Sequence, residues 1–344
     1  MKKQVCSFGE VLMRLSPPGK LRFQQTQQFD ITFGGAEANV AIGLSYLNEP
    51  SSIISCVPDN PIGKQALHFF QGHGVDVQHI QQTGDRLGIY YLENGALSRS
   101  SQVVYDRDHS AFGTLPTGSI DWEKIFEQAD WLHWSGITPA VSASAAALTL
   151  EALKAARKAG VTISTDLNYR HKLWNYGIPP NEIMPELVEY CDVIIGDVNA
   201  SKVFFDLAVP GWRFTMDPDY EKYQQFVSLL MQRFPQCKTV AITHRGSLSA
   251  SDNRWSAMIA DREQFKHSPI HELNGIIDRI GAGDSFTAGI IYGLRNFGTD
   301  LQKTINFAAA TSALKHSILG DASLLSVEEI LPLMEGDSSG RVAR

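Results

Sequence analysis

Strand-like and helix-like segments alternate along most of this 344-residue chain, and that alternation limits its fold more than any other feature. The strand-like segments are short and β-rich, and segments with helical periodicity separate most of them. Strands joined through helices form parallel βαβ units, so the pattern predicts an α/β fold: a Rossmann-like, mainly parallel open sheet flanked by helices on both faces. The predicted strands are Ser52–Val57, Trp131–Gly136, Val161–Asp166, Asp192–Gly196 and Lys238–Thr243, and the predicted helices are Ile62–Gly72, Ala143–Ala159, Asp284–Asn296 and Leu301–Ser317.

Two segments break this alternation. Arg86–Glu93 and Ser101–Arg107 are both strand-like, and the turn signal Asn94-Gly95 and a few polar residues separate them, which predicts a β-hairpin. Leu12–Phe33 lacks helical periodicity and contains Pro17-Pro18-Gly19. Together they predict a small β-stranded lid, with two ordinary surface loops as the alternative. The predicted division is a core of residues 1–11, 34–85 and 114–335, a lid of 12–33 and 86–113, and a flexible tail of 336–344.

Charge and composition exclude several classes of protein. The net charge is -7 and no basic run occurs, so nucleic acid is excluded as a partner, because neutralising phosphates needs clustered Lys and Arg. No apolar stretch approaches the length of a membrane span, and Glu10 and Arg14 interrupt the N-terminal one, which fails as a signal peptide. We therefore expect a cytoplasmic protein with no membrane partner. Its cysteines form no close pairs and are expected to be reduced, mostly buried thiols: Cys6, Cys56, Cys191 and Cys237.

The sharpest chemical signal is the sequence Asp-Arg-Ile-Gly-Ala-Gly-Asp at residues 278–284. Glycines let the backbone turn tightly, and a helix begins directly afterwards, so amide groups and the helix dipole converge on a point that suits an anion. Asp284 lies in the first turn of this helix, where the dipole is expected to keep it ionised and able to accept a hydroxyl proton. Taken alone, the same sequence also fits a well-capped helix.

A second glycine-rich turn lies near the N-terminus. Gly34-Gly35 precede a helix of small residues, so the backbone can approach a ligand closely, and Asn39 offers both a donor and an acceptor. The alternative is a tight turn whose small-residue helix packs on the sheet.

These two segments, in this order and separation, resemble the ribokinase-like sugar kinases, or PfkB family. A closer similarity is to the 2-keto-3-deoxygluconate kinases, and the whole resemblance covers residues 5–330. It implies a Rossmann-like domain with a β lid over the sugar. The segments that carry this closer similarity are Phe8-Gly9-Glu10, Leu87-Gly88-Ile89-Tyr90, Val104-Tyr105-Asp106-Arg107, Ser135-Gly136-Ile137-Thr138-Pro139-Ala140, Asp166-Leu167-Asn168-Tyr169-Arg170 and Ser249-Ala250-Ser251-Asp252-Asn253.

The resemblance implies ATP and Mg²⁺ as cofactors and a role for each matching residue. Asp284 corresponds to the catalytic base, and the amides of Gly281, Ala282 and Gly283 to its anion hole. The residues that match sugar contacts, besides Asp284, are Gly35, Asn39, Tyr90, Tyr105, Arg107 and Arg170. Those that match the nucleotide side are Asn168, Arg170, Thr243, Arg245, Gly246, Gly281, Gly283, Asn306 and Ala309.

The pair Arg107 and Arg170 predicts the substrate, because guanidinium groups bind carboxylates through paired, charge-assisted hydrogen bonds. We expect ATP-dependent phosphorylation of the terminal hydroxyl of a small sugar acid, 2-keto-3-deoxygluconate giving its 6-phosphate. Kinases for neutral sugars such as fructose or ribose remain an alternative. An oxidoreductase that binds a dinucleotide is excluded, because no Gly-x-Gly-x-x-Gly follows the first strand.

One segment departs from the family pattern. Many members carry Asn-x-x-Glu, associated with Mg²⁺, where this chain has Gly196-Asp197-Val198-Asn199. Asp197 is a candidate substitute, since Mg²⁺ prefers oxygen ligands. The same departure leaves open a catalytically weakened sugar-binding sensor. An exposed lid edge is compatible with a homo-oligomer.

Overall fold

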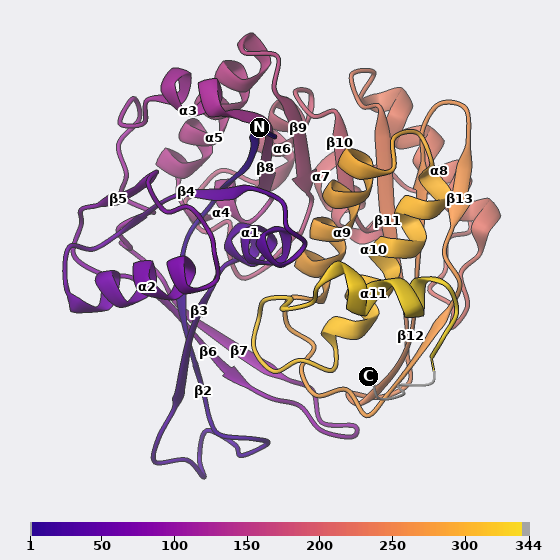
Figure 1. Ribbon diagram of the computed structural model, residues 1–344, viewed down its shortest axis with the longest axis horizontal. Helices are drawn as coiled ribbons and strands as arrows, with labels where there is room; N and C mark the ends of the chain where they lie inside the picture. Colours follow the sequence, from indigo (N-terminus) through magenta and orange to yellow (C-terminus); the bar gives the residue numbers. More distant parts are fainter. Residues whose placement is uncertain (1, 339–344) are drawn as a thin grey trace.

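The computed structural model of this chain describes residues 2–338, and a large sheet covered by helices dominates it (Figure 1). The order of strands is β13-β12-β11-β10-β9-β8-β1-β4-β5, with β14 also paired to β12. The bounds of these strands are β1 Gln4–Phe8, β4 Ser51–Val57, β5 Ile80–Gln82, β8 Ala129–Ser135, β9 Thr162–Asp166, β10 Val193–Gly196, β11 Thr239–Ser247, β12 Asp252–Ala260, β13 Phe265–His267 and β14 His271–Asn274.

Helices cover both faces of this sheet, as the alternating pattern predicts. Every pairing from β5 through β11 is parallel, whereas β12, β13 and β14 add an antiparallel edge. The helices are α1 Ala36–Tyr46, α2 Pro61–Gly72, α3 Trp122–Gln128, α4 Thr138–Val141, α5 Ala143–Lys158, α6 Pro180–Val188, α7 Val198–Phe205, α8 Tyr220–Arg233, α9 Ala282–Asn296, α10 Leu301–Lys315 and α11 Val327–Met334. None of the helices within residues 2–338 is long and apolar enough to cross a membrane.

The core divides into two layers because successive strand residues point to opposite faces of the sheet. In β8, Leu132 and Trp134 belong to the larger apolar cluster, which α3, α5, α6, α7 and α8 complete. Trp131 points the other way, into the cluster that α1, α9 and α10 complete. Strands buried on both faces of the sheet are short and β-rich in this chain, which is why these segments could be recognised in the sequence.

A separate four-stranded sheet forms the lid, with the order β3-β2-β6-β7. In Figure 1 it extends away from the main sheet, below α2. Its strands β2, β3, β6 and β7 lie within the two segments predicted for the lid, except that β3 ends at Gly34. Their bounds are β2 Leu12–Ser16, β3 Asp30–Gly34, β6 Gly88–Glu93 and β7 Gln102–Asp106.

The connection between β6 and β7 lies where the sequence predicts it, after Glu93 and before Gln102. Ala96 and Arg99 exchange two backbone hydrogen bonds of 2.9 and 3.0 Å, and Leu97 between them has φ 51°. A tight turn over residues 96–99 therefore lies within the predicted connection, just beyond Asn94-Gly95. Of the predicted tail, residues 336–338 follow α11, and residues 339–344 lie outside the described part of the chain.

Candidate active site

The first turn of α9 holds Asp284, and α1 packs beside it. Asn39 on α1 donates a hydrogen bond of 2.7 Å from Nδ2 to Asp284 Oδ2. These residues are 245 positions apart in the chain, and the fold unites the two glycine-rich turns as the sequence resemblance implied. The Asn39 amide fixes one carboxylate oxygen of Asp284.

Burial changes the acidity expected for Asp284. Loss of water around this carboxyl raises its pKa to about 8, with Asp166 and Glu37 adding to the rise and Asn39 and Arg170 opposing it. The expectation that the helix dipole keeps Asp284 ionised is therefore wrong for the ligand-free site. Removal from water is the largest cause of the rise, and the two neighbouring acids add to it.

Gly281 caps α9 in a conformation that only glycine adopts readily. Its φ is 77°, and a β-carbon on it would lie 1.6 Å from the carbonyl oxygen of Asp321. No side chain caps the helix, so the first amides of α9 remain without an intrahelical partner. The turn of Gly281, Ala282 and Gly283 thus has the geometry of an anion site directly beside Asp284, and we call it the anion turn.

Asp166 is a carboxylate of this site that the sequence analysis did not select. It ends β9, and its Oδ1 accepts a hydrogen bond of 3.1 Å from the Asn168 amide. Burial raises its pKa to about 7, Arg170 opposes that rise, and Asp197 and Glu37 add to it. A β-carbon on Gly283 would lie 3.9 Å from Asp166 Oδ2, so this acid faces the anion turn. Its position at the carboxyl end of a central parallel strand was the available signal.

Three arginines surround the site without carboxylate partners among residues 2–338. Arg170 follows β9 and is exposed, Arg245 lies on β11, and Arg279 precedes the anion turn. Burial lowers the pKa of Arg245 to about 10, and the charges of Arg279 and Arg170 lower it further. The Arg245 guanidinium lies 5.0 Å from the centre of the Trp255 ring. Positive charge that forms no ion pair within residues 2–338 suits a polyanion. Arg279 was not selected from the sequence.

The remaining residues predicted for the nucleotide side differ in accessibility. Thr243 is half-buried on β11. Gly246 follows Arg245, and a β-carbon added to it would lie 2.3 Å from the carbonyl oxygen of Met216, so only glycine fits there. Asn306 on α10 accepts a hydrogen bond of 2.9 Å from Gln302 and is partly exposed. Ala309 is fully buried in the core between α10 and the sheet, so it offers no surface to a nucleotide here.

The predicted sugar contacts on the lid already have protein partners. Arg107 forms a buried, two-point ion pair with Glu10, with Nε 2.7 Å from Oε2 and Nη2 also in contact with Oε2. Tyr90 is buried and donates to Asp321, whereas Tyr105 is half-buried beside Arg107. The free guanidinium expected at Arg107 is thus neutralised by an acid 97 residues away, which the sequence could not reveal.

The backbone at Gly35 lies in close contact with the backbone of Glu10. Gly35 caps α1 with φ 137°, and a β-carbon there would lie 2.2 Å from the carbonyl oxygen of Glu10. The glycine therefore lets the start of α1 approach the segment that holds Arg107.

Asp197, the predicted metal ligand, caps α7. Its side chain accepts a hydrogen bond of 2.9 Å from the Ala200 amide. Within residues 2–338, no group of three or more His, Cys, Asp or Glu side chains is arranged to hold a metal ion. A dedicated metal site made of protein ligands alone is therefore not present in the described chain.

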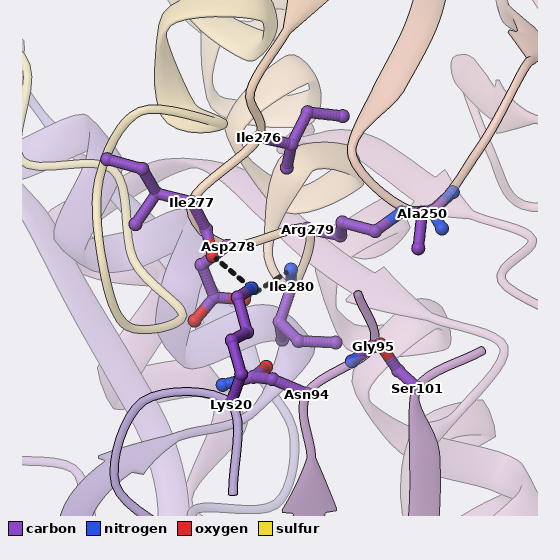
Figure 2. Close-up of a pocket in the computed structure, with 10 residues that line it drawn as sticks. All are labelled: Lys20, Asn94, Gly95, Ser101, Ala250, Ile276, Ile277, Asp278, Arg279 and Ile280. Carbon is purple, nitrogen blue, oxygen red and sulfur yellow. Dashed lines mark hydrogen bonds between the residues drawn. The ribbon is translucent and has the colours of Figure 1, made fainter. Parts of the chain in front are cut away.

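The lid rests on the segment that leads into the anion turn. Figure 2 shows the narrow space between them, with Asn94, Gly95 and Ser101 of the lid facing Asp278, Arg279 and Ile280. Lys20 Nζ donates to Ile277 O at 3.2 Å across this boundary. The cavity holds about 10 Å³, which is room for about one water molecule.

Comparison with known proteins agrees with this geometry. The pfkB family of carbohydrate kinases matches residues 2–326. The crystal structure of a 2-dehydro-3-deoxygluconokinase from Thermotoga maritima superposes with a TM-score of 0.91 at 42% identity, covering 97% of this chain and 100% of that one. A PfkB carbohydrate kinase from Listeria grayi superposes with a TM-score of 0.87 at 34% identity, over 97% and 100% of the two chains.

A curated relative agrees in length as well as in sequence. The 2-dehydro-3-deoxygalactonokinase of Haloferax volcanii is 28% identical over 342 residues, which is 99% of each chain. Because the family match spans nearly all of the α/β core and the lid, and includes both glycine-rich turns, this chain belongs to the pfkB family of carbohydrate kinases.

Proposed function

We propose that this kinase transfers the γ-phosphoryl group of ATP to the terminal hydroxyl of a keto-deoxy sugar acid, with 2-keto-3-deoxygluconate giving its 6-phosphate as the first candidate. The observation that carries the reaction is Asp284, oriented by Asn39 at 2.7 Å and placed beside the open amides of the anion turn. Base and anion site lie together, as in-line phosphoryl transfer requires.

The proposed transfer forms one bond to phosphorus, breaks another and moves one proton. The sugar hydroxyl oxygen forms a bond to the γ-phosphorus, the bond from that phosphorus to the β–γ bridging oxygen breaks, and the hydroxyl proton passes to Asp284. The amides of Gly281, Ala282 and Gly283 receive the charge of the group in transit. Since the transition state is loose, Asn39 contributes mainly by holding the carboxylate in line.

The phosphate charge is met by the three unpaired arginines and by Mg²⁺ that arrives with ATP. Arg170, Arg245 and Arg279 supply positive charge around the turn. Asp166 and Asp197 are the acids whose oxygen atoms would fit Mg²⁺ or its water ligands, because Asp166 faces the turn and the nearby charge of Asp197 raises the pKa of Asp166. The cation neutralises phosphate oxygens when it is bound.

Relatives and the lid support a sugar acid as substrate. The Thermotoga maritima and Haloferax volcanii proteins are named as kinases of 2-dehydro-3-deoxy sugar acids. Arg107 uses Nε and Nη2 for Glu10, and Nη1 has no partner within residues 2–338, so one edge of the guanidinium is free for a carboxylate.

The Arg107–Glu10 pair also favours a second candidate, a kinase for a neutral sugar. A guanidinium whose charge is already balanced by Glu10 does not need a carboxylate from the substrate. The two candidates differ in what the loss of Arg107 does to each substrate.

Turnover with ATP separates them. For a sugar acid substrate, Arg107→Ala should lower kcat/KM by roughly 30- to 1,000-fold, about 2–4 kcal/mol, because a buried carboxylate loses a charged partner. With fructose the same change should matter far less. Arg86→Ala is the matched control, since Arg86 is a lid arginine paired with Asp106 at 2.8 Å and more exposed. Wild type that prefers fructose, or equal losses on both substrates, would leave the neutral-sugar kinase.

Location and assembly follow as further proposals. Use of the ATP pool and buried, reduced thiols fit a cytoplasmic enzyme. The outer strands β3 and β7 of the lid are unpaired on one side within the described chain, which fits a homo-oligomer formed through that sheet.

A further inference from the structure

A buried group of charged side chains joins the lid to the anion turn. We name it the lid–turn cluster: Arg14 on β2, Tyr90 on β6, Asp278 and Asp321. Arg14 donates from Nη2 to Asp278 Oδ2 at 2.9 Å and from Nη1 to Asp321 Oδ1. Tyr90 donates to the other oxygen of Asp321. Two lid strands thereby hold two loops of the core.

Both acids of the lid–turn cluster also hold backbone at the anion turn. Asp278 Oδ1 accepts from the Ile280 amide at 3.0 Å, and Oδ2 accepts from the Gly320 amide at 3.2 Å. The carbonyl oxygen of Asp321 lies so close to Gly281 that no β-carbon would fit between them. A movement of either acid therefore moves the turn that receives the phosphoryl group.

Burial makes the lid–turn cluster behave as one unit. Arg14, Asp278 and Asp321 are each 3% exposed or less. Burial opposes the charge of Arg14, but Asp321 and Asp278 raise its pKa above the ordinary value. Lys315 is also fully buried nearby, bound to Ile318 O at 3.0 Å. A buried charge that loses its partner lowers the stability of the fold. The lid strand that holds Arg14 and the loops that hold Asp278 and Asp321 must therefore move together if the ion pairs are to be kept.

The strand register of the lid places Arg14 and Tyr90 side by side. Arg14 on β2 pairs with Tyr90 on β6, so both side chains lie on the same face of the lid sheet. Within the lid, Arg14 is steadied by a hydrogen bond of 2.8 Å from Nε to Ser16 Oγ.

We propose that Arg14 is a positioning residue that transmits the position of the lid to the anion turn, so that closure of the lid and alignment of Gly281–Asp284 are one event. Arg14 touches neither the hydroxyl nor the phosphate in this assignment. It acts through Asp278 and Asp321. The inference rests on the kinase reaction of the proposed function but not on the identity of the sugar.

The test compares two buried arginines of the same kind. Arg295, in the last turn of α9, is also paired with two acids, Glu49 at 2.9 Å and Asp130. Its side chain is 6% exposed, and the 15 residues of α9 place it about 20 Å from the anion turn. Arg14→Lys and Arg295→Lys each keep the charge and lose the forked geometry, so they should cost similar stability.

Only the Arg14 variant should lose catalysis. We expect Arg14→Lys to lower kcat by roughly 10- to 100-fold with any accepted sugar, since a small misplacement has that effect, while the KM for ATP changes little. Arg295→Lys should keep kcat within about 2-fold. Equal kcat in the two variants overturns the proposal, and an inactive wild type instead counts against the proposed function.

Hydrogen exchange supplies a readout that a merely structural arginine would not move. In wild type, sugar binding should slow exchange in both the lid, residues 86–107, and the turn, residues 278–285. In Arg14→Lys it should slow the lid but not the turn. Should Arg14→Lys fail to fold, Ser16→Ala removes one bond to Arg14 and should weaken the same coupling. Undiminished coupling in the folded variant, or a wild-type turn that ignores sugar, overturns the proposal.

Discussion

The Asp284 carboxyl belongs to a group of acids whose charges oppose one another. Asp166 and Glu37 both raise its pKa, and Glu37 is itself fully buried, accepting hydrogen bonds from Ser135 and Thr138. Opposite charge lowers such a pKa. The Arg170 guanidinium opposes this rise and therefore favours the ionised base.

The pH dependence of turnover follows from these shifts. The profile of kcat/KM reports the free enzyme, in which the pKa of Asp284 is about 8, so kcat/KM should rise as pH increases from 6 to about 8. The profile of kcat reports the same ionisations in the substrate complex. Because Asp166 has a pKa of about 7 and interacts with Asp284, the two macroscopic steps belong to the pair. Steady-state rates at saturating and limiting sugar measure both profiles.

Replacement of this acid checks the assignment. Asp284→Asn should lower kcat by roughly 100-fold or more.

The same variant tests the effect of the raised pKa on stability. A raised pKa means that the folded state keeps a proton which the unfolded chain loses above about pH 4, so wild type loses stability as pH rises toward 8. The midpoint of urea unfolding of Asp284→Asn should therefore fall less between pH 5 and 9. Asp59→Asn, at an exposed acid, is the control. A normal kcat would remove Asp284 from the mechanism.

At the scale of elements, the turn before α9 depends on a contact as well as on a backbone angle. Gly281 and Gly298 both have positive φ, 77° and 61°, so an alanine at either costs about 1–2 kcal/mol. Only at Gly281 does a β-carbon meet backbone, whereas nothing lies within 4 Å at Gly298. Gly281→Ala should lose at least about 100-fold in kcat, and Gly298→Ala should keep it. Steady-state kinetics and thermal unfolding of both variants measure this difference, and similar activity in the two would contradict the importance of the Asp321 contact.

The elements themselves were predictable because their signals are local. Ser142 caps α5, since its side chain accepts a hydrogen bond of 3.1 Å from the Ala145 amide, and a serine directly before a helix is a local sequence signal. The β-rich runs of the sheet and the helical periods of α2, α5, α9 and α10 depend on neighbours within a few residues. The connection of the lid hairpin was predictable for the same reason, because Asn94-Gly95 is a local turn signal and the tight turn follows directly after it.

At the scale of the molecule, ion pairs between residues far apart in the chain could not be predicted from the sequence. The site was found from two glycine-rich turns and a family resemblance, and Asp284 and Asn39 meet as that resemblance implied. Glu10 with Arg107, and Arg14 with Asp321, join residues about 100 and 300 positions apart. No local period encodes such pairs, so neither the Glu10 partner of Arg107 nor the lid–turn cluster was foreseen.

The four cysteines offer a probe of the whole molecule, since all of them lie in the larger apolar cluster of the sheet. Burial raises the pKa of Cys6 and Cys56 to about 11 and that of Cys237 to about 12. Thiolate is the reactive form, so at pH 8 a soluble disulfide reagent should react only through opening of the core. Ligands that bind the native state should slow the reaction, by up to about 100-fold at 100 times Kd if opening is global. In denaturant all four thiols should react at once. A thiol that reacts quickly in the native protein, with no slowing by sugar and ATP, would show that the core opens locally and that the lid and sheet do not protect it as one unit.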